Sequence, residues 1–363
     1  RLSLVGSEMC IRDSSETERV SAALNFNQVL LNDRLKFDAN IKGTRTADQF
    51  APGGVLGGST NFAPTQPVLD ANDPSGFWEW SQASLLVPEN PLGELAYIVD
   101  EGTAYRSVGG LNTQIDIPWV TGLTLTSNLG YDVTKTERYY FAPGFIKGQR
   151  DNAYPGTVSR SNNTQLNTLF DAYLNYKRPI GASNDLELTG GYSYEDSYNT
   201  FPSFYANGLS FDLLGPDGIP GAEERGNSMF VDESRLISFF GRMNYSIAGK
   251  YLFTGSIRRD GSSKFGPEEE WGIFPSAAFA WRLIDEDFMA GNEMFSDLKL
   301  RLSWGKNGNQ AFASYQQYSD YLIGNPQAQV QFGNRYVTTI RPSAADPGIK
   351  WEETTSYNAV SYT

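Results

Sequence analysis

Hydrophobic and polar residues alternate along much of this chain, most clearly over residues 234–260. One face of the first run there carries Ile237, Phe239, Met243, Tyr245 and Ile247, and the other carries Ser238, Arg242, Asn244 and Ser246, with Phe240 as the exception. A second run repeats the alternation after a turn at residues 248–250. Because successive side chains of a β-strand point to opposite faces, the pattern predicts a hairpin with one apolar and one polar side.

Two tyrosines, Tyr245 and Tyr251, lie just inside the turn of this predicted hairpin. Aromatic residues in such positions are typical of the level where the apolar band of a membrane-spanning hairpin meets water. A surface hairpin of a soluble β-sandwich explains this segment equally well. The rest of the chain must therefore decide between the two.

The same alternation recurs in about eleven segments, which we predict to be strands. They lie near residues 20–27, 35–42, 105–117, 123–133, 170–176, 186–194, 234–247, 251–260, 273–283, 298–304 and 349–359. The clearest of them sets Leu298, Leu300, Leu302 and Trp304 against Lys299, Arg301 and Ser303.

The connections between these strands alternate in length. Short links follow the first, third, fifth and seventh strands, whereas stretches near residues 46–104, 134–163, 197–231 and 261–270 follow the second, fourth, sixth and eighth. An up-and-down antiparallel barrel with short periplasmic turns on one rim and long external loops on the other produces this parity. A soluble sandwich or propeller has no reason to collect its long loops at one end.

The polar faces carry ionised side chains, such as Asp38 and Lys42. A closed soluble barrel would bury them unpaired at a cost of several kcal/mol each, whereas a water-filled lumen leaves them solvated. We therefore predict an all-β fold, namely a partial antiparallel up-and-down transmembrane β-barrel of about eleven strands within a larger wall. On this fold Leu298, Leu300, Leu302 and Trp304 are lipid-facing, and Lys299, Arg301 and Ser303 are lumen-facing.

Composition then narrows the function. The formal net charge of −13 would repel phosphate backbones, so we expect no nucleic-acid partner. The chain has no histidine, which removes the commonest general base and metal ligand. It also has no run of about 18 apolar residues, so the sequence predicts no transmembrane helix.

Three short motifs invite a chemical function and do not support one. The serines in residues 259–263 have no histidine to activate them. The three glutamates at residues 268–270 are typical of a solvated charge run, and residues 70–76 resemble a calcium loop without its terminal glutamate. We therefore expect no catalytic residue, no metal and no cofactor, and we do not expect an enzyme.

Aromatic side chains in two long loops are the candidate ligand-binding residues. Trp78 and Trp80 lie in the first expected external loop, and Phe204 and Tyr205 lie in the third. Such rings stack on sugars or pack against a covering protein. The alternative is packing within the loops themselves.

Both ends of the chain resemble translated sequencing adapters. We expect residues 1–14 and residues 360–363 to be non-native, and residues 15–359 to be part of a barrel domain. On this expectation the chain is an internal piece of a longer protein.

Four segments carry a more specific signal, namely Lys250–Gly266, Trp271–Arg282, Leu298–Gln310 and Ile349–Asn358. Together and in this order they resemble the barrel of SusC/RagA-type TonB-dependent outer-membrane transporters. The resemblance implies a multi-pass outer-membrane protein, whose full barrel has roughly 22 strands around a plug. It also implies a SusD-like lipoprotein over the outer mouth, energy from the TonB complex, and oligosaccharide or peptide cargo. Neither the plug nor the TonB-contacting segment is recognisable in this chain. A soluble or surface-anchored carbohydrate-binding β domain is the alternative function.

Overall fold

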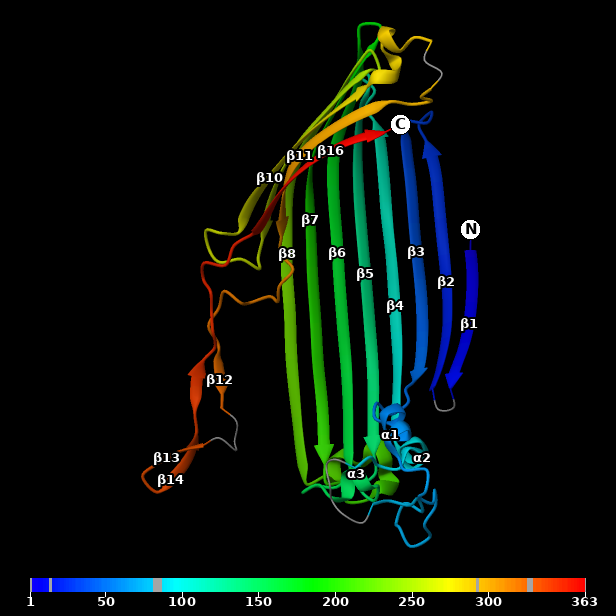
Figure 1. Ribbon diagram of the computed structural model, residues 1–363, viewed down its shortest axis with the longest axis vertical. Coiled ribbons are helices and arrows are strands. Elements are labelled where there is room, and N and C mark those ends of the chain that lie inside the picture. The colour runs from blue at the N-terminus through cyan, green and yellow to red at the C-terminus, as the bar shows by residue number, and fades with distance from the viewer. Residues whose placement is uncertain (1, 13–14, 81–86, 292–293, 325–328, 363) are drawn as a thin grey trace.

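The computed structural model describes residues 2–12, 15–80, 87–291, 294–324 and 329–362, and one antiparallel sheet dominates it (Figure 1). The strands in sheet order are β1 (Leu2–Arg12), β2 (Ser15–Leu30), β3 (Leu35–Gln49), β4 (Val99–Asp116), β5 (Leu123–Ala142), β6 (Thr157–Ile180), β7 (Asn184–Asn207), β8 (Glu224–Ile247), β9 (Tyr251–Ser262), β10 (Trp271–Arg282), β11 (Lys299–Asn309) and β16 (Glu352–Tyr362). Every strand as far as β11 pairs with the next along the chain, and β11 pairs with β16. The predicted up-and-down all-β arrangement is confirmed.

The eleven predicted strands correspond to β2–β11 and β16, and β1 is an addition. β1 pairs with β2 from Leu2 opposite Leu24 to Arg12 opposite Ser15. Residues 360–362 likewise belong to β16. Both suspected adapter segments therefore extend the sheet, and their non-native origin stays a prediction.

Three strands are much longer than the sequence pattern predicts. β6, β7 and β8 each contain 24 residues, whereas about 9 to 11 residues suffice to cross a bilayer. The loops expected at residues 134–163 and 197–231 are therefore wrong over most of their length, since the actual connections are residues 143–156 and 208–223. Backbone pairing continues where each face mixes polar and apolar side chains, so the alternation that signals a strand disappears there.

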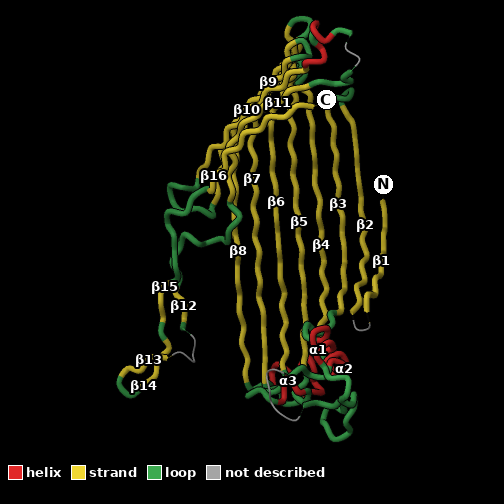
Figure 2. The backbone as a smooth tube through the Cα atoms, viewed as in Figure 1, coloured by secondary structure: helices red, strands yellow, loops and turns green. Residues whose placement is uncertain are grey.

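The predicted parity of the connections is confirmed. Short turns at residues 31–34, 117–122, 181–183 and 248–250 lie at the upper rim in Figures 1 and 2. The segments at residues 50–80, 87–98, 143–156 and 208–223 lie at the opposite rim, which we call the long-loop rim. The link from β10 to β11 is longer than the other upper connections and contains two 3-10 turns, Leu283–Asp285 and Asp287–Met289.

Two of the short turns use the left-handed backbone region. Asn32 and Asp33 have φ values of 54° and 66°, and Ala248 and Gly249 have values of 51° and 68°. Consecutive positive φ angles give a turn whose twist matches that of the flanking strands. Asn, Asp and Gly tolerate this conformation, whereas Ala248 adopts it at a steric cost.

The long-loop rim contains three short helices, α1 (Val55–Asn61), α2 (Pro91–Tyr97) and α3 (Lys147–Arg150). α2 begins at Pro91, whose fixed φ angle suits the first position of a helix. Asn90 caps it by accepting a hydrogen bond from the Leu92 amide, and its Nδ2 atom donates to the carbonyl oxygens of Val68 and Trp78. None of the described helices is long and apolar enough to cross a bilayer.

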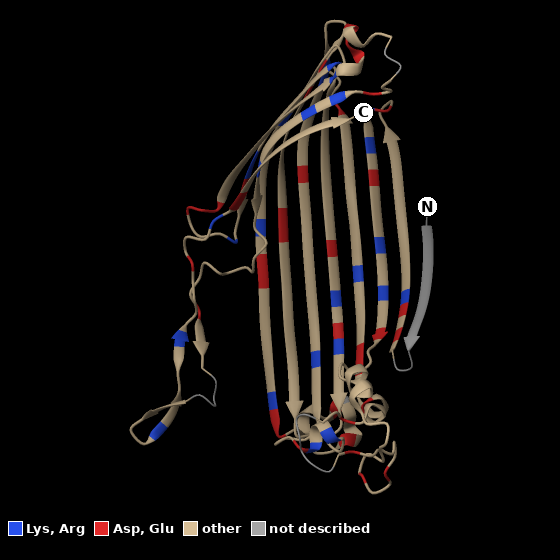
Figure 3. Cartoon of the chain, in the orientation of Figure 1, with Lys and Arg blue, Asp and Glu red and all other residues tan. Residues whose placement is uncertain are grey.

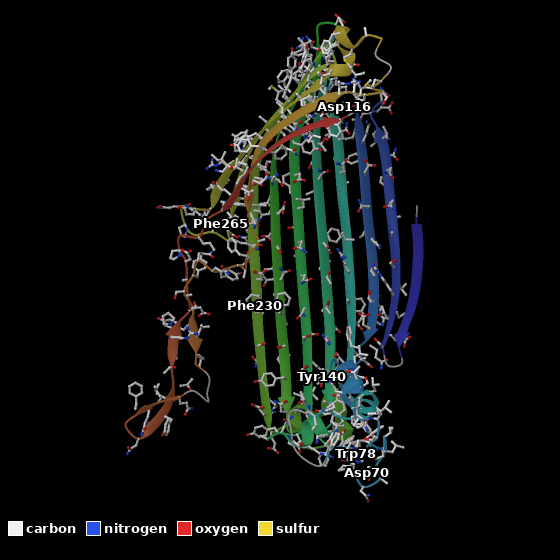
Figure 4. All side chains as sticks on the ribbon, in the orientation of Figure 1. Asp70, Trp78, Asp116, Tyr140, Phe230 and Phe265 are labelled. Carbon is white, nitrogen blue, oxygen red and sulfur yellow. The ribbon has the colours of Figure 1, made fainter. Side chains whose placement is uncertain are left out.

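An aromatic cluster joins the ends of β9 and β10 to the segment before β16 (Figure 4). Phe265 packs against Trp351 at a centroid distance of 4.6 Å, and Phe274 packs against the same indole at 5.2 Å. The Trp351 Nε1 atom donates a hydrogen bond of 3.0 Å to the Glu270 carbonyl oxygen. The three rings come from three of the four segments that resemble the SusC/RagA type, so these segments build a packed junction.

The smaller hairpins lie in the long connection between β11 and β16. They are β12 (Tyr321–Ile323) paired with β15 (Ile340–Pro342), and β13 (Gln329–Phe332) paired with β14 (Arg335–Thr338). Neither belongs to the main sheet.

Candidate functional site

Cross-strand pairing shows which side chains share a face of the sheet, because directly opposed residues point the same way. Leu302 lies opposite Phe279, Phe279 opposite Phe253, and Phe253 opposite Tyr245. Apolar positions that were predicted separately on four strands thus form one continuous row. We call the face that carries this row the apolar face.

Further rows continue the apolar face across the sheet. The next row toward the long-loop rim is Trp304, Ala277, Gly255, Met243 and Leu188. Its large side chains are exposed, as are others on the same face, including Leu24, Phe26, Ile41, Leu129, Leu174 and Phe239. An exposed apolar surface that crosses so many strands marks contact with a membrane or with another molecule.

Charged residues bound the apolar face on the side of the long-loop rim. Lys135 and Glu137 on β5 form an ion pair of 3.0 Å, and Arg235 on β8 pairs with Asp196 on β7 at 2.7 Å. Figure 3 shows acidic and basic residues interleaved along β3–β8. The apolar face is therefore a band of limited height, with a mixed charged belt beyond it.

The opposite face, which we call the polar face, carries a ladder of hydrogen bonds between strands. Thr254 donates to Asn244 at 3.0 Å, and Asn175 donates to Glu187 at 2.9 Å. Asn244 and Glu187 are opposed in the register, so these bonds continue from β9 to β6. Neighbouring polar side chains satisfy one another without an apolar core above them.

Bidentate ion pairs strengthen the polar face. Arg138 donates from Nε and Nη2 to the two carboxylate oxygens of Asp100 at 2.8 and 2.7 Å. Arg106 holds Asp132 in the same way at 2.9 and 2.5 Å. Two parallel hydrogen bonds fix a guanidinium far better than a single one does, so these charges are held in place along the wall.

The predicted wall residues of β11 separate as expected between the two faces. Leu300, Leu302 and Trp304 lie on the apolar face, and Arg301 and Ser303 lie on the polar face opposite Ala280 and Ala278. Lys299 is on the polar side at the start of the strand, and Leu298 immediately precedes it. That the first group meets lipid and the second an aqueous lumen stays a prediction.

The tryptophans of the first loop pack against each other and against the loop. The rings of Trp78 and Trp80 are 4.9 Å apart in an edge-on arrangement, and Phe62 lies 5.8 Å from Trp78 (Figure 4). The Nζ atom of the buried Lys147 donates to the Trp80 carbonyl oxygen at 2.5 Å. Both indoles are half-buried, so only part of each ring is open to a ligand.

The expected loop position of Phe204 and Tyr205 is wrong. Both residues lie in β7, where Phe204 opposes Asn227 and Tyr205 opposes Gly226. As neighbours in a strand they point to opposite faces, and the Tyr205 ring lies over Gly226, where a side chain would otherwise be. They therefore cannot form one binding surface together.

A carboxylate cluster that the sequence analysis missed lies beside these tryptophans. The two carboxylate oxygens of Glu79 accept hydrogen bonds of 3.0 and 3.1 Å from the backbone N–H of Asn90, and Glu89 and Glu94 are neighbours of Glu79. Burial, followed by repulsion from Glu89 and Glu79, raises the pKa of Glu94 to about 7. Sequence spacing gave no signal, because these three residues converge only through the loop's tertiary fold.

A network of hydrogen bonds around a single glutamate, Glu286, lies at the rim of short turns. Glu286 accepts hydrogen bonds from the Tyr251 hydroxyl at 2.6 Å, from the Trp281 Nε1 atom at 2.9 Å and from Lys250 at 3.2 Å. The first two bonds, with that of Lys250, lower the pKa of Glu286 to about 2. Tyr251, predicted as an aromatic residue inside the turn, is thus fixed by a carboxylate.

The motifs that resembled chemical sites are occupied by structural contacts. Asp73 accepts from Ser75 and forms an ion pair of 2.8 Å with Arg150. The buried Asp260 pairs with Arg258 at 2.7 Å, within β9. In the described part of the chain, no three His, Cys, Asp or Glu residues are grouped to hold a metal.

Comparison with known proteins identifies the family to which this chain is related. A family model described as TonB dependent receptor-like, beta-barrel matches residues 16–360. TonB-dependent receptor SusC of Bacteroides thetaiotaomicron is 30% identical over 365 residues, which cover 95% of this chain and 36% of SusC. TonB-dependent receptor P3 of Formosa agariphila is 30% identical over 361 residues, which cover 93% of this chain and 34% of that receptor. The chain thus spans about a third of the length of these curated relatives.

Solved structures agree on the fold. The RagAB peptide importer in its closed-closed state superposes with a TM-score of 0.77 at 20% identity, over 98% of this chain and 39% of that one. The siderophore receptor PiuA from Acinetobacter baumannii superposes with a TM-score of 0.53 at 11% identity, over 99% of this chain and 50% of that one. These relatives are receptors and transporters rather than enzymes, and the soluble β-domain alternative finds no support among them. The predicted resemblance to SusC/RagA-type transporters is confirmed, and the chain belongs to the TonB-dependent receptor β-barrel family.

Proposed function

We propose that this chain forms part of the barrel wall of a TonB-dependent active importer in the outer membrane. The apolar face meets the lipid, and the polar face lines the aqueous lumen. The long-loop rim faces the cell exterior, and the short turns face the periplasm.

The register of the sheet is the observation that carries this proposal. Apolar and polar positions stay on opposite faces through row after row of cross-strand pairs, as between Leu302 and Phe279 on one face and between Asn244 and Thr254 on the other. A wall between lipid and water needs this separation over the full height of the bilayer. A soluble sheet would cover its apolar face with a second layer, and the described residues place none over the apolar rows.

The proposed partners follow from the family. A SusD-like lipoprotein would cover the long-loop rim, and the TonB complex would supply energy through a plug. The cargo is an oligosaccharide or a peptide, the latter supported by the name of the RagAB importer. Trp78, Trp80, Phe204 and Tyr205 remain the proposed contacts for cargo or lipoprotein, with Phe204 and Tyr205 acting from different faces of β7.

Import can be tested with the complete gene in a bacterium that lacks its own copy. Labelled oligosaccharides and labelled peptides are supplied separately, with and without a functional TonB protein. We expect TonB-dependent uptake of one class and none of the other. Membrane insertion without uptake of either class would contradict the proposal.

A further inference from the structure

The apolar face contains a hollow of about 700 Å³ over β8–β11 and β16. Gly255 and Ala277, which are opposed in the register, form its floor. Its walls include Met243, Phe253, Trp304 and Tyr357.

No side chain fills this hollow from within the described part of the chain. A methyl group added to Gly255 would meet no atom within 4 Å. None of the described lining residues is charged, and the volume falls in the range of about 300 to 1,000 Å³ that is typical of ligand sites. A polar ligand would lose its hydration there without compensation, whereas a hydrocarbon chain would not.

A cation lies on the same face, closer to the long-loop rim. Arg259 is exposed and packs over the Trp271 ring at 4.4 Å from its centroid. Lys306, which lies between the hollow and the charged belt, is neutralised by Glu353 at 2.6 Å. Arg259 has no carboxylate within ion-pair distance among the described residues, so its charge is available to an anion.

The spacing between hollow and cation fits within one lipid leaflet, since barrel strands are tilted from the membrane normal. Gly255 and Arg259 are four residues apart on β9, which is about 13 Å along a strand. Half of the hydrocarbon core of a bilayer is about 15 Å. The exposed side chain of Ile257 lies between them, and the exposed Ile273 lies opposite Arg259 on β10, so the path from the hollow to the cation is apolar.

We propose that this hollow holds an acyl chain of an outer-leaflet lipid whose phosphate pairs with Arg259. This site rests on the proposed function, because it requires the apolar face to meet lipid. A phospholipid and a phosphorylated glycolipid share the required chemistry, an acyl chain and a phosphate.

The test measures lipid that stays bound to the protein. The protein is produced from its complete gene, extracted from outer membranes in mild detergent and washed, and bound lipid is identified by mass spectrometry. Phospholipid and glycolipid are distinguished by mass. We expect about one retained lipid per chain, a loss of at least about tenfold in Gly255→Leu, and a loss of up to about fivefold in Arg259→Gln.

Matched controls lie on the same face, outside the hollow. Gly43 on β3 also has no atom within 4 Å of an added methyl group, and Arg45 lies two residues beyond it. Gly43→Leu and Arg45→Gln should retain lipid as the unaltered protein does. If Gly255→Leu fails to assemble, Ala277→Leu replaces it in the test, because this change fills the same hollow.

Several outcomes would overturn the site. The first is an unaltered protein that retains no lipid, and the second is equal lipid retention by Gly255→Leu and Gly43→Leu. The third is a hollow-filling variant that changes only the oligomeric state, because this would assign the hollow to a second copy of the chain. Heat-modifiable mobility in the membrane fraction and cargo uptake are measured on the same samples. Bound lipid without uptake would contradict the transport function alone, and uptake without bound lipid would contradict only the lipid site.

Discussion

The middle of the sheet and its long-loop rim are stabilised in different ways. In the middle, residues such as Leu302 and Arg301 are exposed on opposite faces, and each depends on what surrounds the protein. Phe265 and Trp351, in the junction at the loop ends of β9 and β10, are buried against each other, and at the long-loop rim Glu94 is half-buried within a folded loop. On the proposed function the wall meets lipid on one face and water on the other, whereas the junction and the long-loop rim contain small cores of their own.

Removing an aromatic core residue should give the largest effect, and the effect should be confined to the junction of β9, β10 and the segment before β16. Trp351→Ala should destabilise the junction by about 3 to 5 kcal/mol, because it leaves a cavity among Phe265 and Phe274 and removes the hydrogen bond to Glu270. Hydrogen exchange of residues 263–274 should accelerate. Trp119→Ala, at a highly exposed turn, is the control. Equal effects of the two changes would show that the junction formed by Phe265, Phe274 and Trp351 has no core of its own.

Changing neighbouring residues on β11 tests the faces of the wall. Leu302→Arg should cost about 2 to 4 kcal/mol of stability in the membrane, because it places a charge in the row of Phe279 and Phe253, in the middle of the apolar band. Arg301→Leu should be tolerated, because it replaces a solvated side chain. The fraction of heat-modifiable protein in the outer membrane measures both. A larger loss for Arg301→Leu would reverse the assignment of inside and outside.

The stability of the long-loop rim should depend on pH through Glu94. Its pKa is raised to about 7 in the folded loop, so its contribution to stability is complete below the unfolded value near 4.5 and is lost as the pH rises through about 7. Glu94→Gln should therefore slow proteolysis of the first loop at pH 8 and change it little at pH 4. Glu101→Gln, a nearby exposed residue on β4, should have no such effect. A pH-independent benefit of Glu94→Gln would refute this explanation.

The stability of the rim of short turns should depend on pH in the opposite sense, and this effect should be the smallest. The pKa of Glu286 is lowered to about 2, so its contribution is present above about 4.5 and is lost as the pH falls through about 2. Glu286→Gln should accelerate hydrogen exchange of residues 283–290 at pH 7, and the difference should vanish near pH 2. Asp285→Asn, which disturbs only the more exposed pair with Arg282, serves as the comparison. An unchanged exchange rate at pH 7 would show that the cluster does not hold the turn.

The sequence predicted the wall better than the rim. Alternation at Leu300, Arg301 and Leu302 requires only that each strand separates apolar from polar side chains, and this is a local property. The lengths of β7 and β8 escaped prediction because pairing continues where each face mixes polar and apolar side chains and no alternation remains. For the same reason Phe204 and Tyr205 were expected in a loop and lie in a strand.

The contacts at the rim required the tertiary structure. Glu79, Glu89 and Glu94 converge because Asn90 ties the loop to Val68 and Trp78, and no spacing in the sequence indicates that contact. The hollow beside Trp304 likewise depends on the register, which places Gly255 opposite both Met243 and Ala277.

The sequence by itself determined that the chain alternates, where most of its strands lie and to which family it belongs, because these depend on residue type and order. The tertiary structure decided how far the strands extend, which side chains of different strands share a row, and where charges meet. The physical reason is that a strand's two faces are set locally by the pleat, whereas register and loop packing join residues that are distant in sequence.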